Sequence, residues 1–332
     1  MPTFIIAEIS ANHNHNKQIA LDTIRAAKDA GADAVKIQTY TADTITLNCD
    51  SDLFQIRQGT LWDGTSLYKL YQQAYTPWEW HKDLFDYAGE IGIPLFSSPF
   101  DRTAVDFLEQ LGNPIYKIAS FEITDVPLIA YTASKGKPII ISTGIAALTE
   151  IEEALEACKK VGNDDVTLLK CTSSYPAPLD EANLLTIPDM KSRFGCRVGL
   201  SDHTLGDLCA CTAVALGAQV VEKHFIIDRS IGGPDSAFSM EKEEFAAMVR
   251  RIRETEACLG EVSYELSEKM RANRKFSRSL VACADIQKGE LFTEFNIRSV
   301  RPGDGCSPKF LPELLGTPSD RAYRFGEPIV WR

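Results

Sequence analysis

The apolar and polar positions along the chain change their period repeatedly. Short runs rich in valine, isoleucine and phenylalanine alternate with longer stretches that have the spacing of amphipathic helices. Strands that alternate with helices form parallel βαβ units, and eight units over about 250 residues are typical of a closed (β/α)8 barrel. A doubly wound open sheet is the alternative. The predicted strands are residues 4–10, 34–39, 94–99, 116–120, 138–143, 166–173, 197–203 and 220–225.

Two of the stretches between the predicted strands carry signals for the start of a helix. In AYTPWEWH, Thr76 is the predicted N-cap, Pro77 the first helical residue and Glu79 the partner in a capping box. Thr149 and Glu152 have the same spacing in LTEIEEALEACKK. These signals support the alternation of helices with strands.

Several predicted strands carry polar residues two positions apart. Successive side chains of a strand point to opposite faces, so both members of each pair share one face. In a barrel this face is the interior, and active sites of barrels lie at the carboxyl ends of the strands. We therefore expect a polar site at that rim. The pairs are Glu8 with Ser10, Lys36 with Gln38, Ser201 with His203, and Glu222 with His224.

The periodic pattern ends near residue 260, which predicts a barrel domain over residues 1–260. Residues 261–276 are charged and poor in core residues, as in a linker. Residues 277–332 predict a small β-rich domain, with strands in SLVACADI and EPIVW and turns in QKGE and RPGDG. A domain of about 55 residues is marginal by itself, so we expect it to lean on another part of the protein.

Composition narrows the class of protein. The 332 residues are 44% hydrophobic and carry a formal net charge of −11, which argues against a nucleic-acid or anionic-membrane binder. The N-terminus has no basic segment before its short apolar run, and no stretch is long enough to span a membrane. The nine cysteines are scattered and form no CxxC pair, which favours a reduced, cytoplasmic protein.

Two of the five histidines, His203 and His224, end the seventh and eighth predicted strands. A single histidine at a strand end is usually structural, but two at adjacent ends of a barrel can converge on one divalent ion. Asp235 and oxygen atoms of water or substrate would complete the shell. Two nitrogen ligands without a thiolate favour Mn²⁺ or Mg²⁺ over structural zinc.

Lys36 and Lys117 lie inside apolar strands, where an ammonium group is costly unless it is paired or binds an anion. The turn Ser142, Thr143, Gly144 offers hydroxyl and backbone N–H groups of the kind that hold phosphate. Lys117 could instead form a Schiff base. Glu122 follows the same strand and is placed for acid–base work, although a rim carboxylate is more often a cap or an ion-pair partner.

The motifs AEISANHNHN, KIQTY, SSPFD, YKIASFE, STGI, LKCTSSYP, GLSDH, EKHF, GGPD and RPGDG occur in this order. With them the chain resembles, nearly end to end, the sialic acid synthases. These are phosphoenolpyruvate-condensing (β/α)8 enzymes with a C-terminal antifreeze-like SAF domain. The segment LWDGTSLYKLYQQAYTPWEWH, the phrase YKIASFE, and CTSSYP in place of CTNxYP are most similar to the pseudaminic acid synthase branch.

The resemblance implies roles for individual residues. Its catalytic positions fall on Glu122 and Lys117, and its metal ligands on His203 and His224. Its sugar contacts fall on Gln38, Tyr175, Asp235 and Arg301. Its phosphoenolpyruvate site falls on Lys36, Ser98, Lys117, Ser120, Ser142, Ser173 and Ser201. Ser173 and Ser98 replace an asparagine and a threonine of the neuraminate pattern, and His15 stands where many relatives have glycine, without an assigned role. Trp62, in a Trp-Asp-Gly turn, is expected to be exposed.

The implied reaction is a metal-dependent condensation of phosphoenolpyruvate with 2,4-diacetamido-2,4,6-trideoxy-L-altrose, which gives a nine-carbon acid and phosphate. An N-acetylneuraminate or legionaminate synthase uses the same chemistry on another N-acetylated hexose and is the alternative. A sugar-binding protein without turnover is a remote one. The resemblance also implies a domain-exchanged homodimer, in which each SAF domain caps the neighbour's barrel and brings Arg301 to the sugar.

Overall fold

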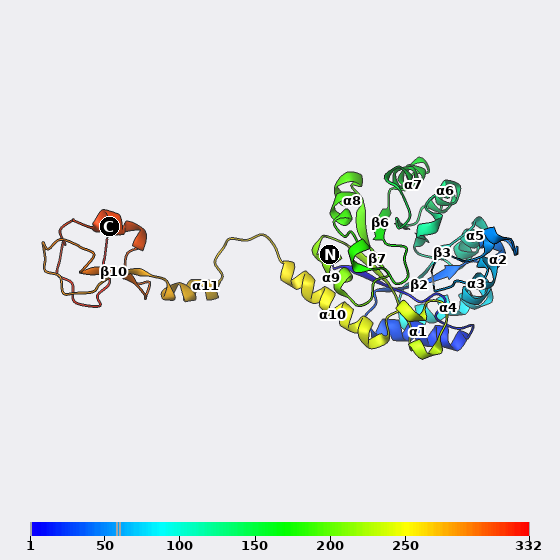
Figure 1. Cartoon of the computed structure of the whole chain (residues 1–332), viewed down its shortest axis with the longest axis horizontal. Coiled ribbons are helices and arrows are strands. Elements are labelled where there is room, and N and C mark those ends of the chain that lie inside the picture. Colours follow the sequence, from blue (N-terminus) through cyan, green and yellow to red (C-terminus); the bar gives the residue numbers. More distant parts are fainter. Residues whose placement is uncertain (1, 58, 60, 332) are drawn as a thin grey trace. The chain divides into compact units, whose positions relative to one another are not determined.

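The computed structural model describes residues 2–57, 59 and 61–331, and it divides into two compact units, Met1–Gly260 and Glu261–Arg332. The first unit contains eight parallel strands that close into a barrel in sequence order (Figure 1). The predicted barrel is confirmed, and the open sheet is excluded. The strands are β1 (Phe4–Glu8), β2 (Ala34–Thr39), β3 (Leu95–Pro99), β4 (Tyr116–Ile118), β5 (Ile139–Ser142), β6 (Val166–Cys171), β7 (Arg197–Asp202) and β8 (Val220–His224).

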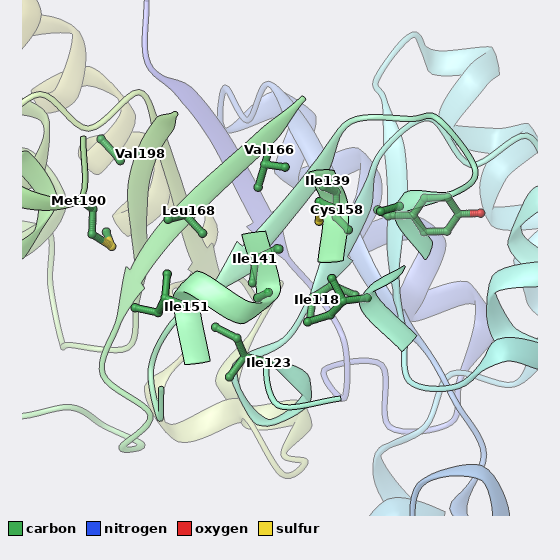
Figure 2. Packing of buried hydrophobic residues seen from close by; sticks show 14 of the residues in the cluster. Ile118, Ile123, Ile139, Ile141, Ile151, Cys158, Val166, Leu168, Met190 and Val198 are labelled. Carbon is green, nitrogen blue, oxygen red and sulfur yellow. The ribbon is translucent and has the colours of Figure 1, made fainter. Parts of the chain in front are cut away.

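Helices surround the barrel on its outside (Figure 1). They are α1 (Lys17–Asp29), α2 (Ala42–Ile45), α3 (Leu67–Ala74), α4 (Trp78–Ile91), α5 (Arg102–Gln110), α6 (Val126–Ala133), α7 (Leu148–Lys160), α8 (Thr186–Phe194), α9 (Leu208–Ala215) and α10 (Lys242–Leu259). Apolar side chains of the strands pack outward against these helices. Figure 2 shows one such cluster, in which Ile139 and Ile141 of β5 and Leu168 of β6 lie among buried residues of the neighbouring helices.

The other face of the strands points into the barrel, and its lowest layer is apolar. Because each strand alternates its faces, every second residue of a strand belongs to the interior. Gly199 of β7 lies level with Val220, and a Cβ there would approach the Val220 carbonyl oxygen to 2.3 Å. Six buried side chains form this apolar layer: Ile6, Ala34, Phe96, Ile140, Leu169 and Val220.

Two predicted helix starts are wrong by a residue or two. Helix α4 begins at Trp78, because Pro77 keeps an extended ψ of 129°, and the Thr76 hydroxyl lies 3.3 Å from His13 Nε2. Helix α7 begins before Thr149, where the Ala147 N–H donates to Glu150 Oε2 over 2.7 Å. The capping interaction therefore exists in α7, two residues earlier than the predicted Thr149 box.

The second unit has its own small core. It contains α11 (Glu268–Asn273), the antiparallel strands β9 (Ser279–Ala282) and β10 (Ile297–Val300), and α12 (Leu311–Leu314). Helix α11 lies within the stretch predicted as a linker. The strand predicted in EPIVW is reduced to an isolated antiparallel bridge between Pro328 and Val281 of β9, with backbone hydrogen bonds of 2.9 Å from Ala282 to the Glu327 carbonyl and from Ile329 to the Leu280 carbonyl. The regular ladder of β9 is formed with β10. In the described part of the protein, no helix combines the length and apolar character of a membrane span.

Candidate active site

Four charged side chains lie inside the barrel, one step above the apolar layer toward the carboxyl ends of the strands. Lys36 of β2 places Nζ 2.6 Å from Glu8 Oε2 of β1 and 3.3 Å from Glu222 Oε1 of β8. Lys117 of β4 places Nζ 3.4 Å from the same oxygen of Glu222. None of the four side chains is more than 5% exposed. We call these residues the charged layer.

Burial and mutual attraction set the charge states of this layer. Burial raises and the two ammonium groups lower the pKa of Glu222, and the net result is about 2. Burial acts to lower the pKa of Lys36, but Glu222 and Glu8 outweigh it and raise the pKa. For Lys117 burial prevails, and its pKa is lowered despite Glu222. Lys117 is therefore the less firmly charged of the two lysines.

Serine hydroxyl groups surround the charged layer. Ser98 Oγ lies 3.5 Å from Lys36 Nζ, and Ser201 donates to Glu222 Oε1 over 3.1 Å. The buried Ser142 Oγ has no hydrogen-bond partner among the described residues. Gln38 lies level with Ser98 in the register of β2 and β3. The barrel thus brings these four predicted substrate residues to one end.

Two more of the predicted serines meet at Gly144, just after β5. The Gly144 N–H donates to Ser120 Oγ over 3.1 Å. A Cβ at Gly144 would lie 2.1 Å from Ser173 Oγ and 2.8 Å from Ser120 Oγ. Only glycine leaves room for both hydroxyl groups, so three loops converge here into a small polar cradle of the kind that accommodates an oxyanion.

The two imidazoles lie side by side at the rim. The ring centroids of His203 and His224 are 5.3 Å apart. Tyr175 covers His203 at a centroid distance of 4.3 Å, and Asp235 Oδ2 lies 3.5 Å from His224 Nδ1. Phe238 contacts the His224 ring edge-on at 5.0 Å. We call these five residues the imidazole cluster.

The donor atoms of this cluster fit a metal ion with substrate or water ligands. His203 Nδ1 lies 3.0 Å from the Thr172 carbonyl oxygen, which can only accept, so Nδ1 carries a proton; in the neutral ring Nε2 then has the lone pair that a metal ion needs. His224 Nδ1 is buried without a hydrogen-bond partner among the described residues, and burial, together with His203, holds its pKa well below the usual value. Within the described residues, no group of three or more His, Cys, Asp or Glu side chains forms a complete metal site.

Glu122 lies in a short 3₁₀ turn, Ser120–Glu122, directly after β4. The residue is partly exposed, but its Oε2 atom is buried and has no hydrogen-bond partner among the described residues. Burial raises its pKa to about 7, although Lys117 acts in the opposite direction. A carboxyl group with this pKa can both accept and donate a proton near neutral pH.

The model of the NeuB family matches residues 23–264, and that of the SAF domain matches residues 277–332. The chain belongs to the NeuB family. This NeuB chain is 48% identical to the pseudaminic acid synthase of Helicobacter pylori over 329 residues, which cover 99% of the chain and 96% of that protein. It is 39% identical to the N,N'-diacetyllegionaminic acid synthase of Campylobacter jejuni over 331 residues, or 98% of each protein.

Comparison with solved structures agrees with the assignment to this family. The N-acetylneuraminic acid synthetase from Leptospira borgpetersenii is 32% identical, with a TM-score of 0.73 over 82% of this chain and 90% of that one. A truncated 3-deoxy-D-arabino-heptulosonate 7-phosphate synthase from Thermotoga maritima has a TM-score of 0.60 over 78% of this chain and 88% of that one, at 13% identity. It shares the fold alone.

Three functional candidates of this NeuB chain were not assigned a role from the sequence. Glu8 and Glu222 were placed on the interior face, but not as partners of the lysines. The alternation of side chains between the two faces of each strand could have suggested that these two carboxylates pair with the lysines. Cys171 Sγ lies 3.7 Å from His203 Nδ1. No sequence signal marks Cys171, because an apolar strand accepts a cysteine as an ordinary core residue.

The structure revises one peripheral expectation for the NeuB chain and describes the surroundings of two further residues. Trp62 is half-buried rather than exposed, and its ring lies 5.6 Å from that of Tyr175. His15 Nε2 lies 3.1 Å from the Gln72 carbonyl oxygen, which ties the first rim loop to α3. Arg301 is exposed in the second unit, and its role at the sugar stays a prediction.

Proposed function

We propose that this chain is a pseudaminic acid synthase, which condenses phosphoenolpyruvate with 2,4-diacetamido-2,4,6-trideoxy-L-altrose. One observation carries this choice within the family. Three pseudaminic acid synthases are 48–49% identical over at least 98% of the chain, whereas two N,N'-diacetyllegionaminic acid synthases are 37–39% identical. Each of these identities is taken over nearly the whole chain rather than over a single motif.

In this proposal the charged layer and its serines bind phosphoenolpyruvate. Lys36 and Lys117 are the cations that pair with its phosphate and carboxylate groups. Hydroxyl groups orient those oxygens. The buried Ser142 Oγ, which has no partner in the described part of the chain, supports such a ligand. The hydroxyl groups belong to Ser98, Ser120, Ser142, Ser173 and Ser201. Fixing both reactants in this way lowers the activation free energy by several kcal/mol.

The imidazole cluster holds the sugar aldehyde beside C3 of phosphoenolpyruvate. His203 and His224 would hold Mn²⁺ or Mg²⁺, with Asp235 within reach. When bound, the ion supplies Lewis acidity that makes the aldehyde carbon more electrophilic. Tyr175, Gln38 and Asp235 line the place where the open-chain sugar lies in this proposal, and Arg301 would reach it from a second SAF domain.

Bond formation then follows from the groups present. C3 attacks the aldehyde carbon, and positive charge develops at C2 of the former phosphoenolpyruvate. Glu122, in its carboxylate form, accepts a proton from the water that adds to C2 and passes it to the former aldehyde oxygen, which becomes a hydroxyl group. The new C2 hydroxyl then gives its proton to the departing phosphate as the C2–O bond to phosphate breaks, and a ketone remains. Water, phosphoenolpyruvate and the hexose are consumed, and the nine-carbon acid and phosphate are released. The Schiff-base role of Lys117 is not needed.

The test is phosphate release with phosphoenolpyruvate, Mn²⁺ and a panel of hexoses. We expect the diacetamido-trideoxy-altrose to give the highest kcat/KM, with N-acetylmannosamine lower by at least about tenfold, since each methyl or methylene group that an apolar wall accommodates is worth about 1–3 kcal/mol. Efficient use of N-acetylmannosamine and none of the altrose would assign the chain to the neuraminate branch. If phosphate is released with none of the sugars in the panel, the result would support the sugar-binding alternative.

The compartment and the assembly are part of the proposal. All nine cysteines are free, as in a reducing cytoplasm.

For a domain-exchanged homodimer the test is complementation. His203→Ala and Arg301→Ala variants, each nearly inactive, are mixed and allowed to exchange subunits. A heterodimer then joins an intact barrel to an intact SAF domain at one of its two sites, and roughly a quarter of the activity returns. Proven exchange without recovery would show that Arg301 serves its own barrel.

A further inference from the structure

Glu222 is the residue that joins the two lysines of the charged layer. Its Oε1 atom lies 3.3 Å from Lys36 Nζ and 3.4 Å from Lys117 Nζ. The same atom accepts the Ser201 hydroxyl over 3.1 Å, which fixes the carboxylate from the neighbouring strand. One buried oxygen is thus held by three groups on β2, β4 and β7.

The two lysines depend on Glu222 to different degrees. Lys36 also has Glu8 Oε2 at 2.6 Å. Among the described residues, Glu222 is the one carboxylate within ion-pair distance of Lys117. A buried ammonium group that loses its partner is strongly unfavourable and either moves or gives up its proton. Loss of the Glu222 charge should therefore affect Lys117 far more than Lys36.

We propose that Glu222 is the positioning residue of the anion site, the shared counter-ion that holds the Lys36 and Lys117 ammonium groups charged and at a fixed spacing. The inference rests on the proposed function, in which these lysines bind phosphoenolpyruvate. Glu222 acts through the lysines and takes no part in the bond-making steps. It is thus distinct from Glu122, which exchanges a proton with the reacting water.

The first test separates binding from chemistry. Glu222→Gln keeps the size of the side chain and removes its charge. We expect the KM for phosphoenolpyruvate to rise at least about tenfold, the cost of disturbing a buried ion pair, while the KM for the sugar and kcat change by less than about threefold. Glu109→Gln is the matched control, because Glu109 accepts from Lys137 over 2.6 Å outside this site. It should change neither KM.

The second test does not use turnover. Reductive methylation with formaldehyde and cyanoborohydride modifies only neutral amines, and peptide mass spectrometry reports each lysine. In Glu222→Gln we expect Lys117 to become reactive at a pH at least about one unit lower than in the wild type. Lys36, which retains Glu8, is the internal control and should shift less. The charged and titratable groups around Lys117 are Glu222, Lys36, Cys171, Glu8, Glu122 and His224.

Glu222→Asp separates charge from spacing. The shorter carboxylate remains charged but cannot reach both lysines, so Lys117 methylation should return toward the wild-type profile while the KM for phosphoenolpyruvate stays raised. If Glu222→Gln does not fold, as judged by circular dichroism, the Asp variant carries the test by itself through that KM. A loss of kcat with an unchanged KM, or equal shifts of both lysines, would overturn the proposal.

These outcomes are separable from failure of the proposed function. If the wild type releases no phosphate with any hexose, the function is wrong, yet protection of Lys117 from methylation by phosphoenolpyruvate still reports on the anion site. If the wild type turns over and the Glu222 variants leave the phosphoenolpyruvate KM and Lys117 reactivity unchanged, only the role of Glu222 is wrong.

Discussion

The inner and outer faces of β7 and β8 use polar residues in opposite ways. On the inner face Ser201 lies level with Glu222, and on the outer face Asp202 lies level with Lys223. Asp202 Oδ2 lies 2.7 Å from Lys223 Nζ, and both side chains are 1% exposed. The second Asp202 oxygen accepts the backbone N–H of Thr204 over 2.9 Å and its hydroxyl over 2.7 Å.

The difference lies in whether the protein satisfies its own polar groups. Both carboxylate oxygens of Asp202 have partners, and Lys223 also donates to the Thr204 carbonyl. On the inner face, Glu222 Oε2 and His224 Nδ1 are buried without a hydrogen-bond partner in the described part of the chain. Buried polar groups without partners are rare in native proteins. A satisfied buried pair indicates stability, and unsatisfied ones at a barrel rim indicate a ligand.

The largest effect is expected on the inner face. His203→Ala should lower phosphate release by at least about 10³-fold, because a metal ion contributes several kcal/mol to the transition state. Urea unfolding should show little change in stability. Chelation of the wild type should have the same effect on activity, and Mn²⁺ should restore the chelated wild type but not the variant. Full turnover by metal-stripped protein would contradict the Lewis-acid role.

The Glu122→Gln variant tests the loop after β4, where Glu122 Oε2 is another buried oxygen without a hydrogen-bond partner among the residues that the structure describes. We expect kcat to fall about 10²- to 10⁴-fold, since Gln cannot exchange a proton, with little change in the KM for phosphoenolpyruvate. The wild-type kcat/KM should rise as pH passes about 7, where Glu122 loses its proton, and the variant should lack this rise. Retention of more than half of the activity would make Glu122 structural.

The outer face should show the reverse pattern. Lys223→Met leaves Asp202 charged and buried, which should lower the free energy of unfolding by about 3–5 kcal/mol, while the folded fraction keeps its kcat within about twofold. Asp202→Leu with Lys223→Met should recover most of this stability. Lys242→Met is the control, because Lys242 and Asp29 form an exposed pair at 3.2 Å worth under about 1 kcal/mol. A similar loss in both single variants would contradict the distinction.

The smallest effect is a pH dependence of stability. The pKa of Glu122 is raised from 4.5 to about 7 in the folded protein, so between these values the folded state holds a proton that the unfolded state lacks. This contribution stabilises the protein at acidic pH and is lost as pH rises through about 7, with a slope of at most about 1.4 kcal/mol per pH unit. Urea unfolding from pH 4.5 to 8 should show the slope in the wild type and not in Glu122→Gln.

Much of the fold could be predicted because successive side chains of a barrel strand alternate between its inner and outer faces, with a period of two residues. The spacing of Lys36 with Gln38 and of Glu222 with His224 was enough to assign interior positions. Which charges meet across the barrel could not be derived, since Lys36 contacts Glu222 only after β8 pairs with β1 and closes the sheet. The predicted cap at Thr76 failed for a tertiary reason, because Thr76 and Pro77 fit a cap in isolation but the Thr76 hydroxyl contacts His13 in the fold.

The small domain was harder to predict. The stretch EPIVW has the composition of a strand, yet it meets β9 at a single bridge, and Ile297–Val300 is the segment that forms a regular ladder with β9. Short segments of this kind are decided by the few long-range contacts of a small core, which a local pattern does not contain. The contact of Arg301 with the sugar stays a prediction, because a local pattern does not contain information on assembly.

The apolar layer beneath the charged layer has a kinetic consequence. Its side chains, including Phe96, Leu169 and Ile140, are at most 6% exposed and fill the lower barrel, so molecules enter and leave through one mouth. Lys36 and Glu222 lie two residues deeper along their strands than Gln38 and His224. A ligand bound at the rim therefore blocks the path to the lysines. Under the proposed function, the anion must bind before the sugar, and the nine-carbon product must move away before phosphate can leave from below it.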